Sequence, residues 1–241
     1  MFGLKHLIAG NSNKSRPTLW EVFFKHARPD IDKWQHYIQK YSELFSGLPA
    51  NVTLLEIGVY HGGSLRLWSE YFGPTSTIIG IDNNPDCKKY ESGNIKVAIG
   101  DQGDPQFLSQ LSSRFGGFDI VIDDGSHRVS DQISSFDALI SSTRRMYIIE
   151  DTHAAYWEPD QKKDLLSGLV TRHMDILHGW FVAAGSPELF DDNAWSDRHQ
   201  DDIPQMRHRL VSVELLDSMI IFHLGNNYPP KRLRVRASPS P

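Results

Sequence analysis

Seven short runs rich in valine, isoleucine and leucine most constrain how this 241-residue chain can fold. They span residues 52–58, 77–82, 95–99, 118–123, 146–150, 210–216 and 219–224. Each run is followed by polar or glycine residues, and stretches of helical character lie between most of them. Apolar strands that alternate with helices predict a parallel sheet with both faces covered.

The last two runs are joined only by the tight turn at Asp217 and Ser218, which is too short for a crossover connection. This pair is therefore expected to be antiparallel. The prediction is an α/β fold with a doubly wound, mostly parallel seven-stranded sheet that ends in a C-terminal hairpin. We expect one domain over residues 51–228, preceded by a helical extension over residues 1–50.

The segments outside the sheet show weaker patterns. Apolar residues at three- and four-residue steps predict an amphipathic helix over residues 32–45, with Asp30 or Asp32 as its cap. A long helix is expected over residues 162–180. Residues 186–208 are rich in aspartate and fit a lid over an acceptor as well as a solvated surface loop. Residues 229–241 resemble a flexible tail.

Composition excludes several classes of partner. The net charge is −5 and the pI is near 6.1, so the chain has no basic field for nucleic acid or an anionic membrane. No run approaches the roughly 20 apolar residues of a membrane helix, and the start lacks a secretory cleavage pattern. Cys87 is the only cysteine, which fits a cytoplasmic protein. Homo-oligomerisation stays open.

Residues after the first three runs suggest a nucleotide-like ligand, because such sheets bind ligands at the carboxyl ends of their strands. The first run leads into a glycine-rich turn that reads Glu-x-Gly-x-x-x-Gly-Gly-Ser from Glu56 to Ser64. The second run ends in Asp82, which can accept hydrogen bonds from both ribose hydroxyls. Asp101 and Gln102 follow the third run, in reach of an adenine amino group. Nicotinamide enzymes share such a turn, but their Gly-x-Gly-x-x-Gly pattern is absent.

These segments resemble the motifs of class I S-adenosylmethionine (SAM)-dependent methyltransferases. More narrowly, they resemble metal-dependent sugar O-methyltransferases of the mycinamicin and macrocin type and related polysaccharide methyltransferases. The match covers about residues 30–160 and rests on residues 32–34, His36, Tyr37, and residues 54–68, 81–82, 100–102, 123–127 and 150–152. The resemblance implies that Glu56 and Gly58 lie near the methionine moiety, Ser64 near its carboxylate, Asp82 on the ribose, and Asp101 with Gln102 around the adenine. Asp123 either lines the SAM pocket or braces the turn.

Acidic residues also follow the fourth and fifth runs. Asp123, Asp124 and His127 come after one, and Glu150 and Asp151 after the other. If the two strands are neighbours about 4.8 Å apart, these carboxylates converge and repel one another unless a cation intervenes. Oxygen ligands favour Mg²⁺ or Mn²⁺ over zinc. We expect a metal site at Asp124, Glu150 and Asp151, which the resemblance also implies.

His127 lies three residues after a predicted ligand and titrates near neutrality, which suits a general base that takes a proton from a hydroxyl group. The expected function is SAM- and metal-dependent O-methylation of a sugar hydroxyl on a glycoside, oligosaccharide or polysaccharide. Methylation of a catechol-like hydroxyl is the nearest alternative. An iron-dependent hydroxylase would need a second histidine, for which His153 is the nearby candidate. A non-catalytic SAM-binding scaffold is the remaining alternative.

Overall fold

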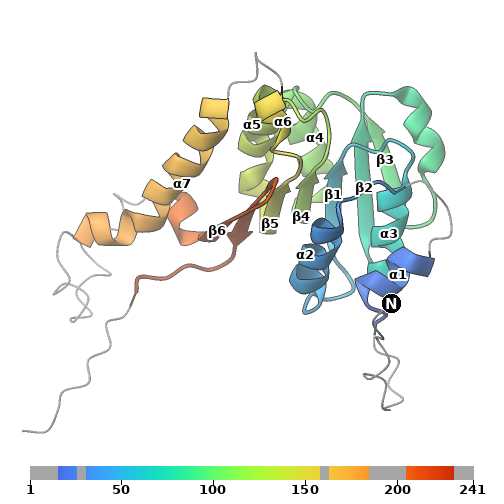
Figure 1. Ribbon diagram of the computed structural model, residues 1–241, viewed down its shortest axis with the longest axis horizontal. Helices are drawn as coiled ribbons and strands as arrows, with labels where there is room; N and C mark the ends of the chain where they lie inside the picture. The colour runs from blue at the N-terminus through green and yellow to red at the C-terminus, as the bar shows by residue number, and fades with distance from the viewer. Residues whose placement is uncertain (1–15, 26–30, 158–162, 185–204, 231–241) are drawn as a thin grey trace, which may run out of the picture.

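A computed structural model describes residues 16–25, 31–157, 163–184 and 205–230 of the chain. Its centre is a seven-stranded sheet (Figure 1). The strands are β1 (Thr53–Ile57), β2 (Thr77–Asp82), β3 (Ile95–Ile99), β4 (Phe118–Asp123), β5 (Thr143–Ile149), β6 (Leu210–Leu216) and β7 (Met219–Leu224). Their order is β3-β2-β1-β4-β5-β7-β6, and β7 runs antiparallel to both of its neighbours. The doubly wound sheet with a C-terminal hairpin is confirmed.

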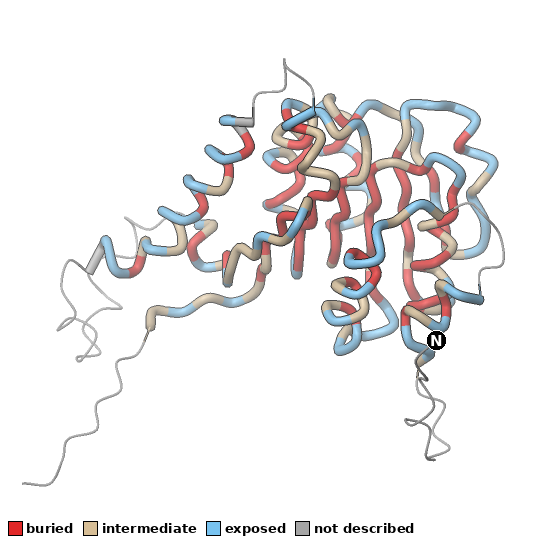
Figure 2. Tube along the Cα trace, viewed as in Figure 1, coloured by how far each residue is buried: buried red, intermediate tan, exposed pale blue. Residues whose placement is uncertain are grey.

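Helices cover both faces of the sheet and create two apolar cores. The first core holds α1 (Leu19–Lys25), α2 (Gln35–Phe45) and α3 (Gly63–Phe72), packed on inward-facing residues such as Leu54 and Ile122. The second core holds α4 (Pro105–Phe115), α5 (Val129–Leu139) and α7 (Lys163–Ala184), packed on the opposite face, which includes Leu55 and Val121. Figure 2 shows the central strands buried along their length. Continuous burial explains why these strands are apolar without alternation.

Helix α2 is part of the first core and is not a detached extension. Four aromatic or aliphatic side chains on one face of it are buried: Tyr37, Ile38, Tyr41 and Phe45. The predicted cap was wrong, because the helix begins after Trp34 and no side chain caps it. Asp30 lies outside the described residues, and Asp32 precedes the helix by three positions. Burial of the apolar face therefore positions this helix in place of a capping hydrogen bond.

Register brings the ends of β1, β4 and β5 together at one edge. Asp123 pairs with Ile149, so Asp124 and Glu150 leave the sheet side by side. Backbone hydrogen bonds extend the pairing: Glu150 N–H donates to Asp123 O at 2.9 Å and Asp124 N–H donates to Ile57 O at 3.0 Å. The expected neighbourhood of the two acidic segments is thus a consequence of strand order.

The hairpin turn between β6 and β7 reaches the same edge. Ser218 adopts a positive φ of 62°, and its carbonyl accepts from Thr152 N–H at 3.2 Å.

The long helix was expected near residues 162–180 and is observed as α7. Of the predicted lid, the structure describes only a short 3-10 helix, Gln205–His208. The tail from residue 231 lies outside the described residues. Every helix that the structure describes is too short or too polar to cross a membrane.

Candidate functional site

A pocket of about 530 Å³ lies over the carboxyl ends of β1 to β4. Four of the predicted cofactor residues line it: Gly58, Asp82, Asp101 and Gln102. Asp124 and Ser126 line the same pocket from the β4 side. The remaining predicted cofactor residues, Glu56, Ser64 and Asp123, do not line it. The pocket therefore lies at the strand ends where the sequence predicts a ligand site.

The carboxylate of Asp82 is held rigidly at the end of β2. One oxygen accepts from the backbone N–H groups of Val59 and Tyr60 at 3.0 and 3.1 Å, and the other accepts from Asn84 N–H at 2.9 Å. Partial burial opposes ionisation, but these three donors outweigh it and lower the pKa of Asp82. The Asp82 carboxylate is thus a fixed anion at the pocket wall.

Gln102 and Asp123 form a buried brace beneath the pocket. The Gln102 amide accepts from Ser126 N–H at 2.6 Å and donates to Asp123 at 3.2 Å. Asp123 is fully buried and also accepts from the Ser135 hydroxyl. Burial raises the pKa of Asp123 to about 6, although its hydrogen bonds oppose the shift. These contacts match the bracing alternative for Asp123.

Glu56 lies below the site, with Oε2 accepting from Ser64 Oγ at 2.7 Å and from Trp68 Nε1 at 3.2 Å. Its other oxygen, Oε1, is buried and has no hydrogen-bond partner among the described residues. Burial raises the pKa of Glu56 to about 7 despite the nearby ammonium group of Lys33. The Ser64 hydroxyl, expected near the SAM carboxylate, is engaged by Glu56 in this structure.

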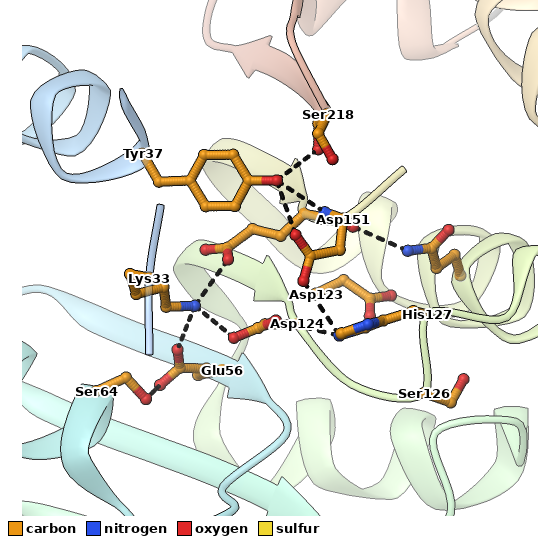
Figure 3. Close-up of polar contacts among 12 residues, drawn as sticks. Lys33, Tyr37, Glu56, Ser64, Asp123, Asp124, Ser126, His127, Asp151 and Ser218 are labelled. Carbon is orange, nitrogen blue, oxygen red and sulfur yellow. Dashed lines mark hydrogen bonds and ion pairs between the residues drawn. The ribbon is translucent and has the colours of Figure 1, made fainter. Parts of the chain in front are cut away.

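Within the part of the chain that the structure describes, three side chains bring potential metal-ligand atoms to within 4.8 Å of one another: Asp124, His127 and Asp151. His127 Nε2 lies 3.2 Å from Asp124 Oδ1 and 3.6 Å from Asp151 Oδ2 (Figure 3). Two of the three predicted metal ligands therefore converge with the predicted base. Glu150, the third, is not part of this group, and its carboxylate contacts Lys33 and Tyr41.

His127 is held by its backbone as well as its side chain. It adopts a positive φ of 58°, which is uncommon for a residue with a Cβ and often marks a functional site. The hydrogen bond to Asp124 raises the pKa of His127 above its ordinary value, and burial opposes that shift only partly. The ring is thus fixed beside the carboxylates and able to hold a proton.

Lys33 occupies the centre of the acidic group, a position that sequence reasoning did not assign. Its side chain is 3% exposed, and its ammonium lies 2.7 Å from Glu150 Oε2, 3.6 Å from Glu56 Oε1 and in hydrogen-bond contact with Asp124. Figure 3 shows the amine between these carboxylates. Burial opposes its charge, but the three anions outweigh burial and raise the pKa of Lys33.

Two tyrosines of α2 contact carboxylates of the site through their hydroxyl groups. Tyr37 Oη lies 2.8 Å from Asp151 Oδ1 and 3.0 Å from Ser218 O, and Tyr41 donates to Glu150. The ring of Tyr41 is fully buried. A usable signal was present, because two tyrosines four residues apart on an apolar stripe each need a partner for a buried hydroxyl.

The donor set fits a hard divalent cation. It combines carboxylate oxygens with one imidazole and has no thiolate, and a buried oxygen of the nearby Glu56 has no hydrogen-bond partner among the described residues. A single cation, the Lys33 ammonium, already bridges Asp124 and Glu150. An iron site of two histidines and one carboxylate is not formed by the described residues, because His153 lies outside the cluster.

Known proteins resemble this chain in sequence and in fold. The chain is 32% identical over 234 residues to demethylmacrocin O-methyltransferase of Streptomyces fradiae, covering 86% of this chain and 55% of that protein. It is 35% identical over 165 residues to mycinamicin VI 2''-O-methyltransferase of Micromonospora griseorubida, covering 64% and 41%. The solved structure of MycE methyltransferase of mycinamycin biosynthesis, in complex with Mg and SAH, superposes with a TM-score of 0.68 at 28% identity, covering 88% and 55%.

The chain resembles these sugar O-methyltransferases in sequence and has the fold of class I SAM-dependent methyltransferases. An O-methyltransferase from Bacillus cereus in complex with SAH, with a TM-score of 0.51 at 14% identity, shares the fold. No family model matches the chain. The chain spans about half the length of the curated relatives it matches.

Proposed function

We propose that this protein transfers a methyl group from SAM to a hydroxyl group of a sugar, with Mg²⁺ or Mn²⁺ bound beside the acceptor. The relatives are named as O-methyltransferases, and one acts at the 2' position of an α-L-rhamnosyl tetracenomycin. A small glycoside is therefore the favoured acceptor, with oligosaccharides and polysaccharides as larger forms of the same chemistry.

One observation carries the proposal: Asp124 belongs both to the wall of the cofactor pocket and to the cluster of potential metal ligands. A ligand in the pocket and a cation at the cluster would thus share one carboxylate as a neighbour. Holding a methyl donor and an activated hydroxyl group side by side is the main requirement of methyl transfer, because orientation removes much of the barrier.

When bound, SAM supplies the methyl group and a divalent cation supplies positive charge that lowers the pKa of a nearby hydroxyl. Asp82 would accept hydrogen bonds from the ribose hydroxyls of SAM. Asp124, Glu150 and Asp151 are the proposed cation ligands. His127, whose Nε2 faces two of these carboxylates, accepts the proton that the acceptor hydroxyl gives up.

The test is transfer of radiolabelled methyl from SAM to a panel of glycosides, with catechol included as a non-sugar acceptor. Labelled glycoside should form with Mg²⁺, and EDTA should abolish its formation. Asp124→Asn should abolish transfer while SAM still binds in isothermal titration. Asp137→Asn is a suitable control, because the Asp137 side chain is exposed and forms an ion pair with Arg172.

Each outcome separates the alternatives. Labelled catechol without labelled glycoside would replace the sugar acceptor with a non-sugar hydroxyl. SAM binding without transfer to any acceptor would support a scaffold protein. Full activity in EDTA would overturn the role of the metal.

A further inference from the structure

The strand order places three regions in a row along the carboxyl edge of the sheet. The cofactor pocket lies over β3, β2, β1 and β4, and the cluster of Asp124, His127 and Asp151 lies at β4 and β5. Because the pocket occupies one side of the cluster, an acceptor has to approach the cluster from the other side. That side lies beyond β5, in the direction of β7. The residues on that side are therefore candidates for acceptor binding.

Aromatic rings from two distant segments meet on that side. His153 links them, with its ring centroid 4.2 Å from that of Trp157 and 6.2 Å from that of Trp34. Both tryptophans are largely exposed, Trp34 at 55% and Trp157 at 72%. A large apolar ring left in solvent forgoes the free energy that its burial would contribute to folding. An exposed pair of such rings beside a reactive cluster therefore indicates a binding surface.

The rings are tied to the cluster through one carboxylate. His153 Nδ1 lies 3.9 Å from Asp151 Oδ1, while Oδ2 of the same carboxylate lies 3.6 Å from His127 Nε2. His153 is held in turn by the hairpin turn, through hydrogen bonds to the Ser218 hydroxyl. The surface thus starts one side chain away from the proposed base.

We propose that Trp34, His153 and Trp157 form the subsite that binds the pyranose ring of the acceptor and presents its hydroxyl to His127. This inference rests on the proposed function and adds the residues that select the acceptor. A pyranose carries a face of C–H groups with partial positive charge, which complements the negative face of an aromatic ring. Its edge carries hydroxyls, which suit the imidazole and carboxylate groups next to the rings.

The occupant follows from the mixed chemistry of the surface. A purely apolar ligand would remove solvent from the polar groups of Asp151 and His153 without offering them a hydrogen bond, which costs free energy. A flexible polyol would offer hydroxyls without a rigid C–H face. A sugar ring satisfies both requirements on one small ligand.

Binding can be measured apart from chemistry by titrating methyl α-L-rhamnopyranoside into protein saturated with SAH and Mg²⁺, with calorimetric detection. Rhamnitol, the open-chain polyol, is the matched ligand control. Trp157→Ala and Trp34→Ala should each weaken glycoside binding about tenfold, equivalent to about 1.4 kcal/mol, without changing SAM affinity. Tyr228→Ala removes a ring of equal exposure, 72%, beyond β7 and should change neither affinity.

The failures are distinguishable. If glycosides are methylated but both tryptophan variants retain wild-type KM, the subsite is wrong and the proposed function stands. If no glycoside is methylated but rhamnoside binding is ring-specific and lost in the variants, the subsite stands and the reaction is wrong. Equal binding of rhamnitol would overturn the ring requirement. A change of molecular mass in sedimentation, with glycoside affinity unchanged, would reassign the rings to an interface between copies of this chain.

Discussion

The ammonium of Lys33 lies 2.7 Å from Oε2 of Glu150, a residue 117 positions later in the chain. The same amine contacts Asp124, so a side chain that precedes α2 neutralises carboxylates at the ends of β4 and β5. A divalent cation at these carboxylates competes with the ammonium for the same oxygens. We therefore expect Lys33 to act as a counter-ion that sets how strongly these carboxylates bind a metal ion.

Lys33→Met should bind Mn²⁺ at least about tenfold more tightly than the wild type, because the substitution removes the positive charge beside the ligands. In EDTA the variant should be less stable by about 3 kcal/mol, since buried carboxylates lose their partner. Electron paramagnetic resonance titration and urea unfolding measure the two effects. Lys40→Met is the control, because Lys40 pairs with Glu214 and Glu43 away from the cluster. Equal or weaker Mn²⁺ binding in Lys33→Met would contradict the competition.

His127→Gln distinguishes a base from a metal ligand, two roles that its place in the cluster permits. As the base, His127 contributes about 10²–10⁴-fold to the rate, so the variant should lose that factor in kcat. Its affinity for Mn²⁺ should stay close to the wild-type value, since the proposed ligands are carboxylates. Steady-state rates and Mn²⁺ titration check this pair of results. A large loss of Mn²⁺ affinity would make His127 a ligand.

The pH dependence of the metal-free protein follows from the contact between His127 and Asp124. That contact raises the pKa of His127 above its ordinary value. Protonation therefore stabilises the fold below the ordinary histidine pKa, and this stabilisation is lost as pH rises through the folded-state pKa. Titration of the ring by NMR in EDTA should show the raised pKa, and Asp124→Asn should lower it. An unchanged pKa in Asp124→Asn would reject Asp124 as the cause.

The fold was predictable because burial on both faces leaves a strong trace in sequence. Each strand of a covered parallel sheet is a short apolar run, and each run ends in the residues that line the site. The wrong helix cap at Asp30 or Asp32 has a physical reason too. Packing of Tyr37 and Tyr41 against the sheet fixes where α2 begins, and packing of this kind is not encoded in the residues next to the cap.

The side-chain partners were harder to predict than the strand ends. Neighbouring acids at the end of β4 diverge: Asp123 turns into the core towards Ser135, and Asp124 faces the cluster. Sequence reasoning left both roles of Asp123 open for this reason. The contacts of Lys33 with Asp124 and Glu150 span 91 and 117 positions, so only the folded chain brings them together.

Gly58 shows that one predicted cofactor residue is also constrained by the sheet itself. Its φ is +96°, and a Cβ built on it would lie 2.1 Å from the backbone oxygen of Asp124. Gly58→Ala should therefore destabilise the fold by about 3 kcal/mol or more, from a strained backbone and a displaced Asp124. The displacement should weaken Mn²⁺ binding as well. Gly47→Ala is the matched control, because nothing lies within 4 Å of the added Cβ. Urea unfolding and Mn²⁺ titration measure both variants, and a Gly58→Ala protein as stable as Gly47→Ala would show that the close approach to Asp124 is not maintained in solution.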